Sequence, residues 1–524
     1  MSTPALSEVA LSDYAKEYDN TVPERTMPRV LEFDIATDSE YNRHLDRVVW
    51  WKMDLCVLPA ATLIFFLSFL DRSNISNARV AGLQEQLGMT DYQYTIALTV
   101  TYVPYILIEI PSNLLLKRVG ANILLPLMLT LWGIVTVFHG LITSYSGLIA
   151  ARFFLGLCEG GLLPGLCLYL SCFYPRRKLQ LRIAIFFCSS ALAGAFSGLL
   201  ATAIIQMNGV GNKPGWAWIF VLEGLFTVLS GLALFFLMPS TPAHAPFFTT
   251  EEKRYVLRYL QRDGVFEGSP DDYDGWNVSA NVSGDESAKA QWREVLRTLV
   301  RPQVVLLIAA GFFNGATLFG LAFTPSIVAS FGYAGNQAQL MSVPPFAAAY
   351  VLSLVTSFIS DRYGRRGATI IACALVSIVG FAMFLGSMNP HVRYASLFLL
   401  LPGTYCAAPP LAAWTANNTA PHTRRAAAIA LLTTLTNAGG ILATWLLGAL
   451  SPAPGYVAAA GTFLGFQVGI VGCAAGAWMW MRGRNRGGRV LAGGAAQVQM
   501  QMQVQVGGEG KGASDESPWF EYTM

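Results

Sequence analysis

The sequence predicts an all-α integral membrane protein with twelve transmembrane helices in two six-helix bundles. Three observations lead to this fold class. The 524 residues are 53% hydrophobic and only 13% charged, whereas a soluble globular chain carries about 25% charged residues. Apolar runs of membrane-spanning length, for which roughly 20 residues are needed, recur along the chain. A polar stretch, 239–301, separates these runs six and six.

The apolar runs define the predicted helices and, with the polar segments between them, the predicted domains. The runs cover 54–76, 92–116, 121–142, 146–173, 182–207, 216–238, 302–330, 337–360, 367–388, 393–416, 425–450 and 458–481. The domains are then a cytosolic N-terminal segment (1–52), a first bundle (53–238), a cytosolic linker with short helices (239–301), a second bundle (302–481) and a disordered cytosolic tail (482–524). The polar, acidic start has no apolar core before a cleavage site, so no secretory signal peptide is expected.

Basic residues set the predicted orientation. They gather in the loops after even-numbered segments and in the tail, at Lys117, Arg118, Arg176, Arg177, Lys178, Arg182, Arg362, Arg365, Arg366, Arg424, Arg425, Arg482, Arg484, Arg486 and Arg489. The opposite loops hold few, mainly Arg79, Lys213 and Arg393. Because short cytosolic loops are enriched in Lys and Arg, both termini and the central loop are expected in the cytosol.

The central linker contains two predicted short helices. Thr249 and Glu252 have the spacing of a capping box in front of EEKRYVLRYLQRDG. Trp292, Val295, Leu296 and Leu299 repeat at helical spacing, which predicts a surface helix.

Several classes of function and partner are excluded by composition and by missing motifs. The net charge of +3 is small and dispersed, so no nucleic-acid partner is expected. The eight cysteines all lie in apolar segments without metal-ligand spacing. The sequence has no His-Glu-x-x-His pair and no Gly-x-Ser-x-Gly elbow, and its histidines are scattered. We therefore expect no metal, no cofactor and no enzymatic activity.

The stretch ARFFLGLCEGGLLPG, 151–165, places Arg152 and Glu159 inside an apolar run. Seven residues of helix put both on one face, roughly 10 Å apart along the axis, so a direct ion pair is not expected. Ionisable residues inside a membrane are functional by default. The functional interpretation is that Arg152 binds an anionic substrate and Glu159 carries a proton. The alternative is a buried structural network between helices.

The first segment supplies a second charged group in FLSFLDRSNISNA, 66–78. Arg72 is predicted at about the depth of Arg152, and two guanidinium groups at one depth can form a receptor for a carboxylate. Asp71 would neutralise one of them in the empty site. Alternatively Arg72 reaches the outer interface. Asn74 is a further candidate, with shaping of the helix end as its alternative role.

Two other glutamates lie in predicted helices. Glu109, near the cytosolic end of the second segment, is either a second proton site or an inner-gate partner for a cytosolic arginine. Glu223 begins the sixth segment behind Trp216 and Trp218, which are typical of an aromatic belt. We expect a structural role for Glu223.

The loop SFISDRYGRRG, 357–367, predicts a cytosolic gate. Asp361 ends the eighth segment, and Arg362, Arg365 and Arg366 lead into the ninth. An aspartate, arginines and a helix end can latch two elements in one conformation and release them in another.

This loop resembles the motif Gly-x-x-x-Asp-Arg-x-Gly-Arg-Arg of the major facilitator superfamily, with Ser357 in place of the first glycine. In the first half, Lys117 stands where that motif has aspartate. Segments over about 50–480 resemble one branch, the fungal allantoate permease group of anion:cation symporters. They are LDRSNISNARVAGLQEQLGMTDYQY (70–94), EIPSNLLLKRVG (109–120), RFFLGLCEGGLLPG (152–165), GWAWIFVLEGL (215–225) and WTANNTAPHTRRA (414–426).

The resemblance implies roles for individual residues. In animal organic-anion relatives such as the vesicular glutamate transporters, which are similar at Arg72, Asn74, Arg152 and Glu159, the arginines are associated with anion binding and the glutamate with proton coupling. Further candidates to line a cavity are Asn314, Phe319, Trp414 and Asn417. For each of these, packing is an equal alternative.

The prediction that follows is a proton-coupled symporter importing a small organic anion, a vitamin-like or nitrogen-source carboxylate, by alternating access. The proton is the only coupling ion expected, the lipid bilayer the only other partner, and the monomer the working unit. The branch implies the plasma membrane. The alternatives are a drug or metabolite:proton antiporter of the same fold and a non-transporting nutrient receptor.

Overall fold

The structure is a computed structural model that describes residues 39–262, 300–333, 336–419, 422–451 and 455–502. The chain divides into two compact units, residues 1–48 and 49–524. Helix α2 (Ser39–Cys56) begins in the first unit, and every contact discussed below lies within the second. The predicted surface helix at 292–299 lies outside the described residues.

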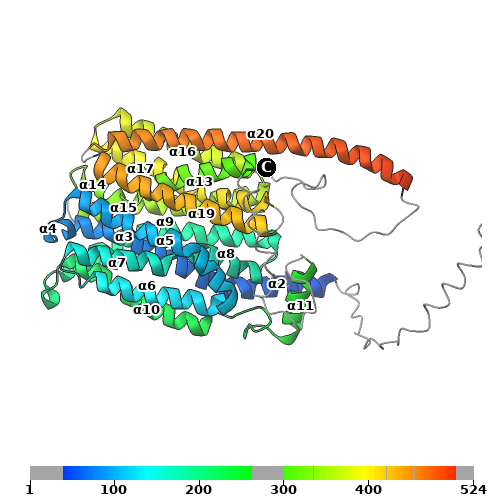
Figure 1. The fold of residues 1–524 in the computed structure, drawn as a ribbon, viewed down its shortest axis with the longest axis horizontal. Coiled ribbons are helices and arrows are strands. Elements are labelled where there is room, and N and C mark those ends of the chain that lie inside the picture. Colours follow the sequence, from blue (N-terminus) through cyan, green and yellow to red (C-terminus); the bar gives the residue numbers. More distant parts are fainter. Residues whose placement is uncertain (1–38, 263–299, 334–335, 420–421, 452–454, 503–524) are drawn as a thin grey trace, which may run out of the picture. The chain divides into compact units, whose positions relative to one another are not determined.

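The second unit is built from helices (Figure 1). The first half holds α3 (Leu58–Val80), α4 (Leu83–Gln86), α5 (Asp91–Val119), α6 (Ala121–His139), α7 (Tyr145–Glu159), α8 (Leu162–Phe173), α9 (Arg176–Ile204), η1 (Ile205–Met207), η2 (Val210–Asn212) and α10 (Gly215–Leu237). After α11 (Thr250–Arg262) come α13 (Pro302–Leu321), α14 (Thr324–Ala329), α15 (Asn336–Tyr363), α16 (Arg366–Gly386), α17 (Pro390–Tyr405), α18 (Ala408–Asn417), α19 (His422–Trp445), the π-helical η4 (Leu446–Leu450) and α20 (Val457–Met502).

Among the described residues, eleven helical spans are long and apolar enough to cross a membrane. They match eleven of the twelve predicted segments. The remaining segment, 92–116, is the continuous helix α5, in which Pro104, Glu109 and Pro111 interrupt the apolar sequence. The all-helical membrane fold is therefore confirmed, while the side on which the termini lie stays a prediction.

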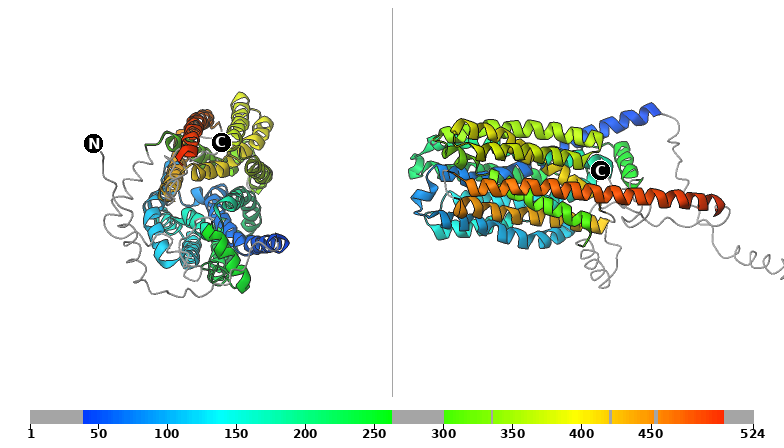
Figure 2. Two further views of the ribbon diagram at one scale, coloured as in Figure 1. Left: turned by 90° about the vertical axis from the view of Figure 1, so that its right-hand side faces the viewer. Right: turned by 90° about the horizontal axis from the view of Figure 1, so that it is seen from above.

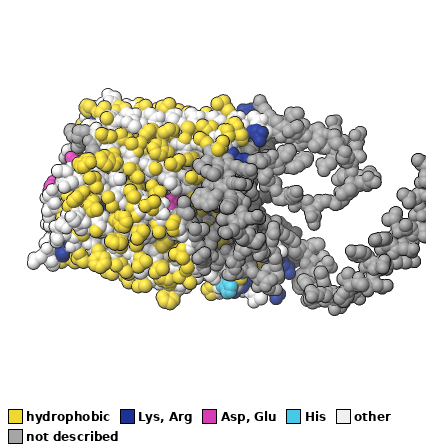
Figure 3. All heavy atoms as spheres, in the orientation of Figure 1, with side chains coloured by type: hydrophobic (Ala, Val, Ile, Leu, Met, Phe, Trp, Pro, Cys, Tyr) yellow, Lys and Arg dark blue, Asp and Glu magenta, His cyan; other side chains and the backbone are white. Residues whose placement is uncertain are grey.

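The outer surface of this unit suits a lipid environment. Hydrophobic side chains cover the flank seen in Figure 3. Phe236 is 90% exposed and Leu107 70%, which would be unfavourable in water but matches hydrocarbon. Such exposure of large apolar side chains is what a membrane-embedded bundle requires.

The helices of each half pack mainly on one another. In the first half, α10 packs on α6, α3 on α9 and α5 on α7. In the second half, α13 packs on α19 and α20, and α16 on α17 and α20. The main contact between the halves joins α9 to α15, and α5 also contacts α19. Seen along its length, the unit is a bundle of helices that run roughly parallel to one another (Figure 2). The residue boundaries of the predicted domains stay a prediction.

The fourth predicted segment of each half is a broken helix, where the sequence predicts a continuous one. Helix α7 ends at Glu159, and Gly161, with φ +91°, starts the turn into α8. In the second half, α17 ends at Tyr405 and α18 begins at Ala408 with proline in its first turn. A left-handed glycine and helix-starting prolines explain both breaks. Interrupted helices at corresponding positions of two repeats mark the binding region of many transporters.

Two further predictions concern the polar segments. The capping box is confirmed, because the Glu252 amide donates to Thr249 Oγ1 at 3.3 Å and the Thr249 amide to Glu252 Oε2 at 2.9 Å. Helix α20 runs on to Met502, although the sequence predicts disorder from 482. No proline occurs between 482 and 502, so nothing forces the last membrane helix to end there.

Candidate functional site

One face of α7 carries both charges of the motif at 151–165. Its buried residues are Leu148, Arg152, Leu155, Gly156 and Glu159. A side chain on Gly156 would collide with the Thr101 carbonyl and with Pro104 of α5. Since the two helices are in backbone contact there, α7 is held with Arg152 and Glu159 facing inward.

Arg72 of α3 and Glu159 of α7 form a buried ion pair. Glu159 Oε1 lies 2.8 Å from Arg72 Nη2 and accepts a hydrogen bond from Arg72 Nε at 2.9 Å. Ser68 Oγ, one turn before Arg72, donates to the same oxygen at 2.5 Å. The Glu159 side chain is 3% exposed and that of Arg72 19%. Arg72 therefore turns inward to Glu159 instead of reaching the outer interface.

Aromatic rings from both halves surround the Arg72 guanidinium. Its Cζ lies 5.3 Å from the ring centre of Phe69, 5.2 Å from Tyr105 and 5.3 Å from Phe319. Phe319 belongs to α13, in the second half. The ion pair thus lies where the two halves meet, and among the cavity candidates of the second half Phe319 is one that reaches it.

Arg152 differs from Arg72 in having no anionic partner among the described residues. It is 3% exposed, and its Nε is buried without a hydrogen-bond partner. Its Cζ lies 6.0 Å from the ring centre of Phe220. A buried guanidinium without an ion pair is costly, so this position has the chemistry to receive an anion.

Among the described residues no ion pair joins Asp71 to an arginine, although Asp71 and Arg152 are close enough to interact electrostatically; neutralisation by Asp71 stays a prediction. Asp71 Oδ2 accepts hydrogen bonds from Trp132 Nε1 and, at 3.3 Å, from Thr136 Oγ1 of α6. Its Oδ1 accepts one from Asn74 Nδ2 at 3.1 Å. The same Asn74 nitrogen donates to Glu223 Oε2 at 2.6 Å. Asn74 therefore bridges two buried carboxyl groups.

Glu109 lies at the contact between α5 and α19. It is 1% exposed, and its Oε2 accepts a hydrogen bond from Thr434 Oγ1 at 3.0 Å. Its Oε1 is buried without a partner. Glu109 thus lies at the interface between the halves with Thr434, and not an arginine, as its hydrogen-bond partner among the described residues; both proposed roles stay predictions.

The other candidates of the second half lie in its packed interior or at its edge. Asn314 is 3% exposed, with its Oδ1 unpartnered. Trp414 is fully buried in the hydrophobic core of that half. Its ring packs closely against Gly367, because a Cβ atom added to that glycine would lie 3.0 Å from it. Asn417, the last residue of α18, is half-buried.

The predicted gate residues divide into a buried and an exposed set. Arg366 Nη2 lies 3.5 Å from Asp361 Oδ1, and Arg366 Nη1 donates to the Ala413 carbonyl of α18 at 3.1 Å. Arg362 and Arg365 are exposed. The structure thus places Asp361 and Arg366 in a tie between α15, α16 and α18.

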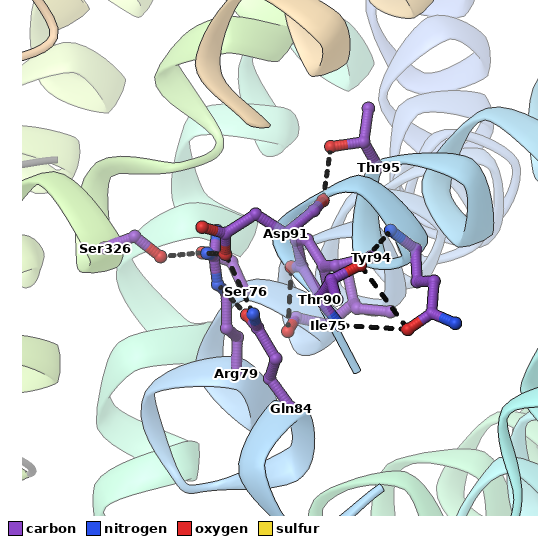
Figure 4. Close-up of polar contacts among 10 residues, drawn as sticks. Ile75, Ser76, Arg79, Gln84, Thr90, Asp91, Tyr94, Thr95 and Ser326 are labelled. Atoms are coloured by element: carbon purple, nitrogen blue, oxygen red, sulfur yellow. Dashed lines mark hydrogen bonds and ion pairs between the residues drawn. The ribbon is translucent and has the colours of Figure 1, made fainter. Parts of the chain in front are cut away.

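The two halves are also in contact at the C-terminal end of α3. Ser76 Oγ faces Ser326 Oγ of α14 at 3.4 Å, and Gln339 Nε2 of α15 donates to the Asn77 carbonyl at 3.3 Å. Beside them, Arg79 Nη2 bonds to Asp91 Oδ1 at 2.6 Å (Figure 4). The halves thus touch on this side of the ion pair.

Sequence reasoning missed four groups that complete the site: Ser68, Trp132, Thr136 and Thr434. Ser68 could have been found, because it lies four residues before Arg72 on the same helix face. Trp132 and Thr136 share the same spacing inside an apolar run. The partner of Glu109, 325 residues away in the chain, has no such local signal.

Comparison with known proteins agrees with this architecture. Residues 61–444 and 306–519 match the family model of the Major Facilitator Superfamily. An uncharacterized transporter of Schizosaccharomyces pombe is 36% identical over 396 residues, which are 75% of this chain and 76% of that protein. The MFS transporter prlL of a fungal species is 34% identical, covering 78% of this chain and 81% of prlL. The major facilitator-type transporter hxnP of Emericella nidulans is 30% identical, covering 79% and 81%.

A solved structure has the same fold. A bacterial homolog of the human lysosomal transporter Spinster, in an inward-facing and unoccupied conformation, aligns with a TM-score of 0.58 at 17% identity. The alignment covers 84% of this chain and 97% of that one. The fold and the family match together identify a membrane transporter and not an enzyme: the chain belongs to the major facilitator superfamily.

Proposed function

We propose that this transporter imports a small organic anion together with a proton, by alternating access. The observation that carries the proposal is the unequal state of the two arginines. Arg72 forms an ion pair with Glu159 at 2.8 Å, whereas Arg152 is buried and forms no ion pair within the described part of the chain. An anion is therefore drawn to Arg152 first, and it must compete with Glu159 for Arg72.

Protonation of Glu159 decides that competition. A neutral carboxylic acid no longer forms an ion pair, so Arg72 is free to bind the anion. Conversely, an ionised Glu159 holds Arg72 and repels the anion. Anion and proton therefore bind together, and the free energy of the proton gradient supports uptake of the anion.

The contacts at both ends of the bundle supply the alternating gates. We assign the outer gate to the contacts of Ser76 and Asn77 with α14 and α15, which join the halves. The contacts of Asp361 and Arg366 with α18 lie within the second half and hold the end of α15 at the inner gate. Glu109 fits a second proton site or an inner-gate residue, because its bond to Thr434 joins the halves. Opening the outer side breaks the first set of contacts, and opening the inner side breaks the bond of Glu109.

The remaining assignments rest on the sequence. The positive-inside rule supports cytosolic termini, and the resemblance to the allantoate permease group supports the plasma membrane and a vitamin-like or nitrogen-source carboxylate as substrate. The Arg72–Glu159 pair and Arg152 lie inside the helices of a single chain, which supports a functional monomer. Export of a drug or metabolite against protons remains the competing outcome.

Uptake tests the proposal. Proteoliposomes containing the full chain are given a panel of labelled carboxylates, nicotinate, pantothenate and allantoate among them, with an inward proton gradient. We expect concentrative uptake of at least one anion, abolished by a protonophore. Arg152→Ala and Arg152→Lys should lose it, and the exposed control Arg482→Ala should keep it. Uptake by Arg152→Ala equal to that of the parent would contradict the anion site.

A further inference from the structure

A buried polar cluster lies behind the Arg72–Glu159 pair, between α3, α6 and α10. Its members are Asp71, Asn74, Trp132, Thr136 and Glu223, of which the least buried is 5% exposed. No residue of this cluster is basic, and no Lys or Arg in the described part of the chain forms an ion pair with Asp71 or Glu223. The cluster therefore holds two carboxyl groups without a neutralising contact.

The hydrogen bonds distinguish the two carboxyl groups. Asp71 accepts from three donors, Trp132, Thr136 and Asn74, and both of its oxygens are used. Among the described residues, Glu223 accepts a hydrogen bond from Asn74 alone, and its Oε1 is buried without a partner. Donors stabilise the charged form of a carboxyl group and burial without donors destabilises it. Although both groups are buried, the charged form of Asp71 is therefore better supported by hydrogen bonds than that of Glu223, and a proton is expected on Glu223 first.

The geometry of Asn74 strengthens this distinction. One amide nitrogen serves Asp71 Oδ1 at 3.1 Å and Glu223 Oε2 at 2.6 Å, so the two acceptors lie close together. Two carboxylates that share a dry site cannot both remain charged. The amide oxygen of Asn74 is itself buried without a partner, which leaves an acceptor in the cluster for a hydrogen carried by Glu223.

Among the described residues, no other charged group near Glu223 forms an ion pair with its carboxyl group. Helix α3 brings Asp71 and, turned toward Glu159, Arg72. Helix α6 brings His139, whose Nδ1 bonds to the Val135 carbonyl at 2.9 Å. The Cζ atom of Arg152 on α7 lies 6.0 Å from the ring centre of Phe220 on α10; Arg152 interacts electrostatically with Asp71 and forms no ion pair with Glu223 among the described residues. Helix α9 has its charged residues at 176–182, in its first turns, and η1 has none.

We infer that Glu223 is a second proton-binding site of the transporter, an inference that rests on the proposed proton-coupled function. The proton passes from water to a Glu223 carboxylate oxygen, forming a carboxylic acid, and returns to water on release, with no other bond changed. Asn74 lies two residues from Arg72 on α3, so any movement of α3 that follows release of Glu159 also moves the group that bridges Glu223 and Asp71. Glu223 binds a proton while Asn74 is hydrogen-bonded to both carboxyl groups. Glu223 releases this proton when α3 moves and those bonds change.

The second proton changes the charge carried in each cycle. One proton on Glu159 with one monovalent anion moves no net charge. A second proton on Glu223 moves one positive charge inward with each anion, so uptake is accelerated by an inside-negative membrane potential.

Infrared difference spectroscopy of the purified full-length protein tests the site without any substrate. The pH is stepped from acidic to alkaline, and the carbonyl band of protonated carboxyl groups is followed. We expect a titrating band that is missing in Glu223→Gln, kept in Glu159→Gln and Asp71→Asn, and shifted in Glu223→Asp. Thermal unfolding of each variant confirms that it is folded. The inference is overturned if Glu223→Gln keeps every band, if the band belongs to Asp71, or if it never titrates. The titration is repeated in sodium buffer and in choline buffer. If the band of the protonated carboxyl group disappears only in sodium buffer, the inference is also overturned, because sodium would then be the ligand.

Membrane potential supplies the functional measurement. In proteoliposomes, a potassium diffusion potential, inside negative, should raise the initial rate of uptake of a transported anion by the parent severalfold. Glu223→Gln should lose this acceleration and still respond to pH through Glu159. Equal acceleration of both proteins refutes the inference and leaves the proposed function intact. A parent that takes up no anion refutes the proposed function, while the infrared result still decides whether Glu223 binds a proton.

Discussion

Replacing Glu159 with glutamine is the most direct perturbation of the proposed coupling. Glutamine retains the size of the side chain and an oxygen that Ser68 can bond. It removes the negative charge that neutralises Arg72 at 2.8 Å. We expect Glu159→Gln to bind the anion more tightly than the parent, yet to lose concentrative, pH-dependent uptake.

The magnitude follows from the contacts that the anion must displace. Glu159 Oε1 accepts a hydrogen bond from Arg72 Nε at 2.9 Å and lies 2.8 Å from Arg72 Nη2 in an ion pair, and the carboxylate is 3% exposed. A hydrogen bond to a charged group contributes about 1.5–3 kcal/mol. Loss of one such competing interaction should tighten anion binding by about ten- to hundredfold. The empty variant should be less stable, because Arg72 loses its partner.

Two assays separate these effects. Equilibrium binding of the labelled anion to purified protein measures affinity across external pH, and proteoliposomes measure uptake and exchange. Glu159→Gln should exchange internal for external anion without accumulating it. The matched control is Ser68→Ala, which removes the 2.5 Å bond to the same oxygen but keeps the ionisable group, and should retain the pH dependence. Weaker anion binding in Glu159→Gln, or pH-driven accumulation by it, would refute the competition between Glu159 and the anion for Arg72.

Three further outcomes are expected. Gly156→Ala should lower the free energy of unfolding by about 1–3 kcal/mol through overpacking against α5. Gly465→Ala is the control, because the space around Gly465 is open, and it should be neutral or slightly stabilising. Thermal unfolding in detergent compares the two variants, and equal melting temperatures would argue against the close contact of Gly156 with α5. Arg366→Ala should reduce uptake more than Arg365→Ala, because Arg366 bonds to the Ala413 carbonyl and the Arg365 side chain is exposed; similar uptake rates would exclude the gate. Burial opposes ionisation of Glu252, but hydrogen bonds from Lys52 and the Thr249 amide outweigh it and hold the pKa of Glu252 below its usual value. Such a carboxyl group stabilises the folded state above its unfolded-state pKa and loses that contribution as pH falls through its folded-state pKa. Proteolysis at α11 should therefore increase at acidic pH in the parent, and Glu252→Gln should be cleaved readily at every pH.

The sequence predicted the fold through patterns that depend on neighbouring residues. Apolar runs of membrane length, a polar divide and a capping box at Thr249 are all local, and the structure agrees with them. The shared face of Arg152 and Glu159 is equally a property of one helix. The break after Glu159 was not predicted, because Gly160 and Gly161 fit a closely packed continuous helix as well as a broken one.

Pairings between helices were decided by tertiary structure alone. The sequence placed Asp71, Arg72, Arg152 and Glu159 in the membrane, but it did not indicate which side chains bond to one another. In the structure Glu159 forms an ion pair with Arg72, Asp71 shares Asn74 with Glu223, and Arg152 has no ion pair among the described residues. Sequence fixes the depth and face of each charge along its own helix. Which charges meet depends on how helices far apart in the chain are rotated and packed, and glycine contacts such as that of Gly156 with α5 set that rotation.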